Sequence, residues 1–325
     1  MGRPTALSIV ADHRSNYALS RVAAIAALIL VSACALPSSG GDEEAPGVEL
    51  PSVPAGHEMV AAGMVHSCAL RKDGTVTCWG VDTGGSTAAP EDTFSALSSG
   101  LFHSCALDLK GHAHCWGSNG SGQVKAAEKR FRDIAAGGAH SCGLDHQGAV
   151  ICWGSDEYGQ SSPPEGNFEA VATGGAHSCA LSSQASITCW GSDEHGQLSV
   201  PDVDFQEVST GSTHSCGIDT DGQAHCWGND ERGQASPPDG TYREICAGTA
   251  HSCAVTEDGR AKCWGSNAHG RSSPPPRDFI SISTGGAHSC GVDHNGNLLC
   301  WDPDIHPWTR PDIDANSQYN RPNFP

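Results

Sequence analysis

His66-Ser67-Cys68-Ala69-Leu70, followed ten residues after its cysteine by Cys78-Trp79-Gly80, is the stretch that decides how this chain is organised. The same pattern returns six more times at intervals of 37 residues, with no insertion or deletion between copies. A sequence that repeats with a period of about 20–50 residues folds as an array of similar units. The seven units occupy 259 of the 325 residues, so we expect one closed array rather than two separate domains.

Each unit is predicted to hold three short antiparallel strands. The second strand is the His-Ser-Cys-x-aliphatic segment, and the third ends in Cys-Trp-Gly. The first begins at an aromatic position, runs through an aliphatic residue and ends at a glycine turn. No segment shows the 3.6-residue periodicity of a helix. The residues at the aromatic position are His57, Phe94, Phe131, Phe168, Phe205, Tyr242 and Phe279.

The turn between the second and third strands determines which residues face each other. Gly74 follows Asp73, a pattern typical of a three-residue hairpin loop with a left-handed glycine. Six units have glycine at this position, whereas Ala185 occupies it in the fourth, at an expected cost of about 1 kcal/mol. With this loop Cys68 faces Cys78 at a non-hydrogen-bonded site, where Cα atoms approach to about 4.5 Å.

Fourteen of the sixteen cysteines therefore fall into seven facing pairs. A disulfide accepts this spacing, and each one would contribute at most about 2–3 kcal/mol before strain is subtracted. A metal held by the histidine and both cysteines of a hairpin, or reduced thiols in the core, are the alternatives. Zinc sites more often use closely spaced cysteine knuckles and four ligands, so we favour disulfides and expect no metal or cofactor. The predicted pairs are Cys68–Cys78, Cys105–Cys115, Cys142–Cys152, Cys179–Cys189, Cys216–Cys226, Cys253–Cys263 and Cys290–Cys300. The remaining cysteines are Cys34 and Cys246.

Residues 1–33 are predicted to be an export signal. An apolar run, residues 22–31, follows two arginines and is too short to span a membrane. It ends in Val31-Ser32-Ala33-Cys34, which resembles the bacterial lipobox; an ordinary secretory signal is the alternative. The resemblance implies a lipid on Cys34 and, because Ala35 follows rather than Asp, sorting to the outer membrane. Residues 34–56 are then a flexible tether, rich in Ser, Gly, Glu and Pro.

The formal net charge of −19 limits the choice of partner. Such a surface repels nucleic acid and anionic membrane faces. We therefore expect a protein partner, no nucleic acid, membrane contact only through the lipid on Cys34, and a monomer.

Two features that recur in every unit are predicted to be structural. Trp79 lies opposite Ser67 and beside Ala69, positions whose small side chains leave room for the indole to wedge between neighbouring sheets. The histidine before each Ser-Cys is predicted to bond the backbone within its own unit, rather than to form a metal or proton site.

Seven three-stranded antiparallel sheets can stack radially into a β-propeller. The motif Gly-x-x-His-Ser-Cys-Ala-Leu-x-x-Asp-Gly-x-x-x-Cys-Trp-Gly, continued by Gly-Gln, resembles the regulator of chromosome condensation repeat family over residues 57 to about 302. The resemblance implies an all-β, seven-bladed propeller, which we place at residues 57–315 with a tail at 316–325. The nuclear members' nucleotide exchange at chromatin does not suit an exported chain. Some secreted bacterial members have short blades, and one is a proteinaceous β-lactamase inhibitor.

The binding face is predicted from the positions at which the units differ. Between Trp-Gly and Gly-Gln one position varies in every unit: Gly84, Ser121, Tyr158, His195, Arg232, His269 and His306. Tyr, Arg and Trp anchor protein interfaces, so the candidate partner-binding rim is Tyr158, His195, Arg232, His269 and Trp308. No catalytic motif stands out, and we expect no enzyme. The favoured hypothesis is a surface-tethered interaction scaffold; the alternatives are an inhibitor of a secreted enzyme, like the β-lactamase inhibitor, and a carbohydrate- or metal-binding propeller.

Overall fold

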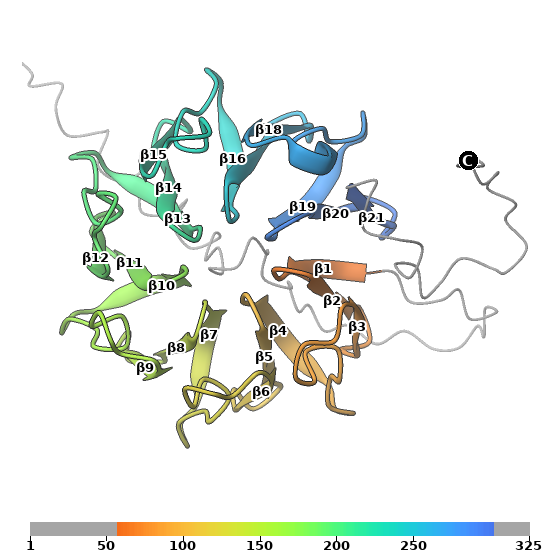
Figure 1. Cartoon of the computed structure of the whole chain (residues 1–325), viewed down its shortest axis with the longest axis vertical. Helices are drawn as coiled ribbons and strands as arrows, with labels where there is room; N and C mark the ends of the chain where they lie inside the picture. The colour runs from red at the N-terminus through yellow and green to blue at the C-terminus, as the bar shows by residue number, and fades with distance from the viewer. Residues whose placement is uncertain (1–56, 302–325) are drawn as a thin grey trace, which may run out of the picture.

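The computed structural model describes residues 57–301, in which seven three-stranded antiparallel sheets form the blades of a ring (Figure 1). The predicted all-β, seven-bladed architecture is confirmed. Each blade uses three consecutive strands, and its first strand lies nearest the axis (Figure 1). The predicted signal (1–33), the tether (34–56), the end of the predicted domain (302–315) and the tail (316–325) lie outside the described residues. No helix within residues 57–301 is long and apolar enough to cross a membrane.

The strands, in chain order and three to a blade, are β1 His57–Ala62, β2 His66–Arg71, β3 Val76–Gly80; β4 Phe94–Ser99, β5 His103–Asp108, β6 Ala113–Gly117; β7 Phe131–Ala136, β8 His140–Asp145, β9 Val150–Gly154; β10 Phe168–Thr173, β11 His177–Ser182, β12 Ile187–Gly191; β13 Phe205–Thr210, β14 His214–Asp219, β15 Ala224–Gly228; β16 Tyr242–Ala247, β17 His251–Thr256, β18 Ala261–Gly265; and β19 Phe279–Thr284, β20 Ser289–Asp293, β21 Leu298–Trp301. A short 3-10 turn, η1 (Ala268–Gly270), precedes the last blade.

The hairpin register is the predicted one. Cys68 is paired with Cys78 across β2 and β3, and Gly74 in the connecting turn has a φ of 82°. All seven predicted disulfides are present, the first with its Cα atoms 4.0 Å apart. Cys246 lies outside these pairs, fully buried on β16, with its Sγ 3.3 Å from the carbonyl oxygen of Ile282.

Replacing Ala185 by glycine is expected to stabilise the protein by several tenths to about 1 kcal/mol. Ala185 has a φ of 62°, in the left-handed region that is costly for a residue with a Cβ. Urea or guanidinium midpoints measure the change. The matched control is Gly222→Ala, at the same position of blade 5 with a φ of 84°, where an added Cβ would come no closer than 3.6 Å to Thr241. Equal midpoints for wild type and Ala185→Gly would contradict the expectation.

The hydrophobic core lies between blades rather than within them. At the first interface Met59 and Leu70 of blade 1 pack against Phe94, Leu97 and Trp116 of blade 2. The same kind of cluster recurs at each of the other interfaces. The predicted role of tryptophan as a wedge between sheets is therefore confirmed. A single blade has little core of its own, so its stability depends on its neighbours.

The innermost strands have a free edge facing the neighbouring blade, and side chains cap several of its N–H groups. Ser98 Oγ accepts from the N–H of Ala136 in the next blade at 3.0 Å, and the corresponding serines of blades 5 and 7 do the same. Carboxyl groups two residues earlier on three inner strands make the same kind of bond: Asp133 accepts from Val171 N–H at 3.2 Å, Glu207 from Ile245 N–H at 3.1 Å, and Glu244 from Ile282 N–H at 3.0 Å. Burial raises the pKa of Glu207, with the Glu244 charge as a second cause, and burial raises the pKa of Glu244 to about 8.

Blade 7 and blade 1 lie side by side in the ring (Figure 1) without sharing a strand. Their interface repeats the contacts of the others. His57 N–H donates to Gly296 O at 3.1 Å, as Phe94 N–H donates to Gly74 O at 2.8 Å between blades 1 and 2. Gly286 N–H donates to Gly63 O at 3.0 Å, and a cluster that includes Trp79 fills the core of this junction. Within residues 57–301, side-chain packing and hydrogen bonds, rather than a shared strand, hold blade 7 against blade 1.

Candidate functional site

The His-Ser motif joins each blade to the next. Nε2 of His66 lies 2.9 Å from Oγ of Ser104, which belongs to blade 2. Six further bonds of 2.5–2.9 Å follow, and the last, from His288 to Ser67, closes the circle. The prediction of a hydrogen bond to backbone within the blade was wrong. The partner is a side chain of the neighbouring unit, because the stacking of sheets brings together residues one repeat apart.

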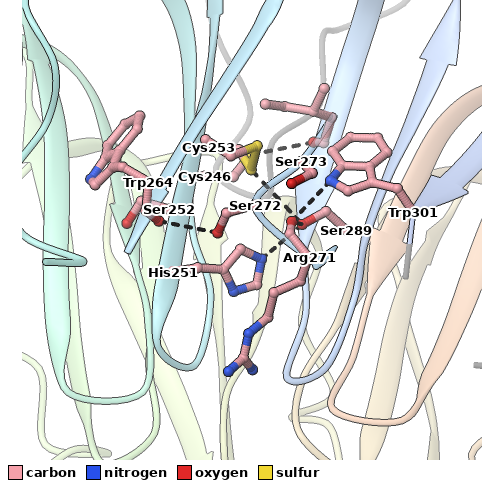
Figure 2. The surroundings of a disulfide bond; sticks show 12 residues. Cys246, His251, Ser252, Cys253, Trp264, Arg271, Ser272, Ser273, Ser289 and Trp301 are labelled. Atoms are coloured by element: carbon pink, nitrogen blue, oxygen red, sulfur yellow. Dashed lines mark hydrogen bonds between the residues drawn. A yellow bond between two sulfur atoms is a disulfide. The ribbon is translucent and has the colours of Figure 1, made fainter. Parts of the chain in front are cut away.

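The serine hydroxyl also lies against a backbone carbonyl oxygen, and this carbonyl determines whether the histidine or the serine donates in the His-Ser bond. Ser289 Oγ donates its only proton to the carbonyl of Arg271 at 3.0 Å, so His251 donates from Nε2 to Ser289. Figure 2 shows this interface, where the Trp301 indole N–H also donates to the Arg271 carbonyl at 2.9 Å. In the preceding interfaces the carbonyl acceptor belongs to Gln123, Gln160, Gln197 or Gln234. The glutamine at the end of each Trp-Gly-to-Gly-Gln segment therefore bonds two side chains of the next blade through its carbonyl.

The imidazoles are held neutral. Their Nδ1 atoms are buried without a hydrogen-bond partner among the described residues. Gly63 packs against the ring of His66, and a Cβ on this glycine would lie 2.4 Å from Cε1 and 2.6 Å from Gly100 O, which explains the glycine in every unit. Burial lowers the pKa to about 3 for His103, His140, His177 and His251, and to about 4 for His66, His214 and His288.

The His-Ser pairs cannot act as nucleophilic dyads on an external substrate. All seven serines are buried, and five of them donate their proton to a carbonyl oxygen: Ser141, Ser178, Ser215, Ser252 and Ser289. Within residues 57–301 no three His, Cys, Asp or Glu side chains are grouped so as to hold a metal ion. The repeated motif therefore builds the ring, and a binding site has to be sought where the units differ.

The segments that follow the third strands form the rim loops, which are residues 81–86, 118–123, 155–160, 192–197, 229–234 and 266–271. Each glutamine side chain holds its own loop. Gln160 is buried, and its Oε1 accepts from the N–H of Tyr158 at 2.9 Å. Asp156 caps the other end by accepting from Ser161 N–H at 2.8 Å. The side chain of Tyr158 is free to face outward, with 52% of the residue exposed.

The rim loops surround the axis on one face, here called the rim face. Each loop begins beside the turn that ends at a His-Ser-Cys strand, since Ser155 N–H donates to Ala139 O at 2.8 Å. The predicted rim residues Tyr158, His195, Arg232 and His269 are all exposed. Neighbouring loops touch, as Nδ1 of His195 lies 3.2 Å from Nδ2 of Asn229. The fifth predicted residue, Trp308, and the predicted lipid anchor, Cys34, lie outside the described residues.

The axial channel is narrow. At its mouth on the rim face a cavity of about 80 Å³ is lined by glycines and small side chains, among them Gly63, Gly174 and Ser212. A second cavity of about 80 Å³ lies along the inner strands, with the hydroxyl groups of Thr173 and Thr210 in its wall. A water molecule takes about 30 Å³ of the liquid, so these cavities suit a few waters. Neither cavity has room for a sizeable ligand, and we take the exposed rim as the better candidate site.

Five rim-face residues were missed by the sequence reasoning: Met64, Val65, Val81, Leu101 and Phe102. They are large and apolar at positions where other units have small or polar residues. A comparison of all variable positions, rather than one, would have found them.

The fold and the rim loops together define a seven-bladed propeller whose blades are joined by a repeated His-Ser, Trp and Gln frame. The model of the regulator of chromosome condensation (RCC1) repeat matches residues 60–85, 94–123, 131–160, 168–197, 205–234 and 242–271. The chain belongs to the RCC1 repeat family. No curated protein matches its sequence.

Several solved structures are similar in fold. The ectodomain of the receptor kinase CR4 from Physcomitrella patens has 24% identity and a TM-score of 0.66, covering 76% of this chain and 73% of that one. The ectodomain of ACR4 from Arabidopsis thaliana has 23% identity and a TM-score of 0.65, covering 76% and 98%. Prp20p from Saccharomyces cerevisiae, described with its binding to Gsp1p and histones, has 18% identity and a TM-score of 0.60, covering 71% and 80%.

Proposed function

We propose that this protein is a non-catalytic scaffold that binds a partner protein through its rim face. One observation carries the proposal: the buried frame repeats from blade to blade, whereas the position that differs most, occupied by Tyr158, His195, Arg232 and His269, is exposed on one face around the channel mouth. Loops on a rigid scaffold are where binding residues concentrate, and Tyr and Arg are frequent interface anchors.

Features outside the rim support a tethered, exported version of this scaffold. Seven disulfides suit an oxidising compartment. The lipobox-like sequence at Cys34 would anchor the chain to the cell envelope, with residues 34–56 as the tether. In this arrangement the protein acts as a monomer at the outer membrane, where its partner is another envelope or extracellular protein. Prp20p, a protein of the same fold, binds proteins.

Replacing Tyr158 and Arg232 together by alanine is expected to weaken partner binding at least tenfold, because the rim would lose its two proposed anchor side chains. The partner is first identified by placing a photo-cross-linking amino acid at position 158 of the full chain on intact cells. Affinity is then measured by biolayer interferometry, with Trp308→Ala as a further rim variant.

Leu109→Ala is the control, because Leu109 is 73% exposed on a hairpin at the opposite end of its blade. Unchanged affinity of the double variant would exclude the rim as the binding site. Capture of a hydrolase that the protein inhibits, or binding of a glycan or metal instead of a protein, would favour the alternative functions.

A further inference from the structure

Within residues 57–301, the large aliphatic and phenyl side chains at three repeat positions of the rim face occur over blades 1 and 2. These positions are the first and second after the glycine that follows each first strand (Gly63 in unit 1), and the first after Trp-Gly. We call Met64, Val65, Val81, Leu101 and Phe102 the apolar sector. In blades 3–7 the first two positions hold Gly138-Ala139, Gly175-Ala176, Ser212-Thr213, Thr249-Ala250 and Gly286-Ala287. The third position holds Ser118, Ser155, Ser192, Asn229 and Ser266 in blades 2–6.

The five side chains lie on adjoining segments of the rim face. Val81 N–H donates to Val65 O at 2.8 Å, and Met64 N–H donates to Leu101 O at 3.3 Å, so the rim loop of blade 1 and the turns of blades 1 and 2 adjoin. Leu101 lines the channel mouth. Val81 is 60% exposed, and the other four side chains are partly exposed.

The propeller does not need these side chains to fold. Blade 3 forms the same strands and the same inter-blade bonds with Gly138, Ala139 and Ser155 at the three positions. The other blades therefore act as an internal control for the structural role of each position. Contiguous exposed apolar surface on a soluble protein marks an interaction site.

The rest of the rim has a different character. The loops after β9, β12 and β15 contain Asp156-Glu157, Asp193-Glu194 and Asp230-Glu231. The aspartates are used within their own loops, as Asp193 accepts from Leu198 N–H at 2.9 Å and Asp230 from Ala235 N–H at 2.8 Å. Glu157, Glu194 and Glu231 are exposed and make no ion pair within residues 57–301. An apolar partner residue seated over blades 1 and 2 would thus have carboxylates on the other side of the channel mouth.

We propose that the apolar sector docks the apolar side chains of a polypeptide segment whose neighbouring residues are lysine or arginine. The inference rests on the proposed protein-binding function and specifies the chemistry of the partner. Apolar contact with Val81 and Phe102 supplies the anchor, and the rim glutamates together with the net charge of −19 select cationic flanks. An acidic segment meets the rim glutamates as well as the exposed Arg232, and is expected to bind more weakly.

The test measures binding of three short synthetic peptides to the full chain. One contains Leu, Phe and Lys; the second has Glu in place of Lys; the third has Ser in place of Leu and Phe. The first is expected to bind at least tenfold more tightly than the others, and to weaken when salt is raised from about 0.05 M to about 0.3 M. Isothermal titration calorimetry gives the dissociation constants.

Variants that copy blade 3 locate the binding. The set Met64→Gly, Val65→Ala, Val81→Ser, Leu101→Gly and Phe102→Ala is expected to lose at least tenfold in affinity. Val81→Ser alone is the check that folding is not involved, since this residue is the most exposed of the five; it should lose several-fold. Glu157→Gln, Glu194→Gln and Glu231→Gln together should remove most of the salt dependence. Leu109→Ala should leave the affinity for the peptide unchanged.

Each of four results would overturn the inference: equal binding of the three peptides, no binding, affinity unaffected by the blade-3 variants, or an apolar sector covered by something else. The last is seen as self-association that the variants abolish, or as a photo-cross-link from position 81 to residues 302–325 of the same chain. The cross-linker at position 158 could capture a partner whose affinity does not change when the apolar sector is substituted. That result would leave the proposed function intact and refute this inference alone.

Discussion

Acidification from pH about 7 to about 5 is expected to unfold the propeller. Seven histidines have a pKa of about 3–4 in the folded protein because they are buried, against about 6.5 in the unfolded chain. Below pH about 6.5 the unfolded chain therefore binds protons that the folded protein does not. The stability due to neutral histidine is complete above pH about 6.5 and is lost as the pH falls towards about 4.

The size of the effect comes from the number of histidines. Each histidine contributes about 1.4 kcal/mol per pH unit to the slope of the free energy of unfolding within this window. Glu207 and Glu244 act in the opposite direction, because their raised pKa values keep protons on the folded protein that the unfolded chain has released. The net slope is on the order of 7 kcal/mol per pH unit, comparable with the whole free energy of unfolding of a typical domain.

Guanidinium unfolding followed by tryptophan fluorescence, repeated at half-unit steps of pH, measures this slope. His177→Gln is the matched variant, because an amide can still donate to Ser215 but does not titrate in this range. It should lower stability at neutral pH and reduce the slope by about 1.4 kcal/mol per pH unit. A midpoint that stays constant between pH about 7 and about 5 would refute the neutral, buried state of the histidines.

Reduction of the disulfides is expected to abolish cooperative folding at 25 °C. Each bond closes a loop of ten residues, worth about 2–3 kcal/mol through the entropy of the unfolded chain. The seven together amount to on the order of 20 kcal/mol, more than the net stability of most domains. The core between blades cannot replace the stability lost with the disulfides, because each interface buries only a handful of large side chains.

Circular dichroism and fluorescence before and after reduction and alkylation test this expectation, with mass spectrometry to count the modified thiols. The double variant Cys179→Ala with Cys189→Ala should lower the free energy of unfolding by about 2–3 kcal/mol and leave the ring folded, because the six other hairpin disulfides remain. A fully alkylated chain that keeps the wild-type unfolding midpoint would show that packing alone maintains the blades.

Within a unit, much of the local structure could be predicted because it is set by short-range geometry. The left-handed Gly74, the pairing of Cys68 with Cys78 and the place of Ala185 follow from turn chemistry and the two-residue period of a strand. The position of Trp116 between sheets followed from the small residue beside it. None of these depends on how the units are arranged around the axis.

The contacts between units were harder to foresee. The bond from His66 to Ser104 joins residues 38 positions apart, and the repeat offers a partner for histidine both within the unit and in the next one. The backbone within the unit was the wrong choice, because the strands of a blade already satisfy that backbone while the serine of the next blade is brought against the imidazole. A serine in every unit at a buried position was the available signal.

The sequence by itself determined the number of blades, the strands within each, the disulfides and the variable position at residues 158, 195, 232 and 269, since each depends on the period and on local sterics. Only the tertiary structure decided that the histidines couple neighbouring blades and that the segments carrying Met64, Val65, Val81, Leu101 and Phe102 adjoin on one face. The physical reason is that radial stacking turns a separation of 37 residues into contact, which makes neighbours of residues that no local rule connects.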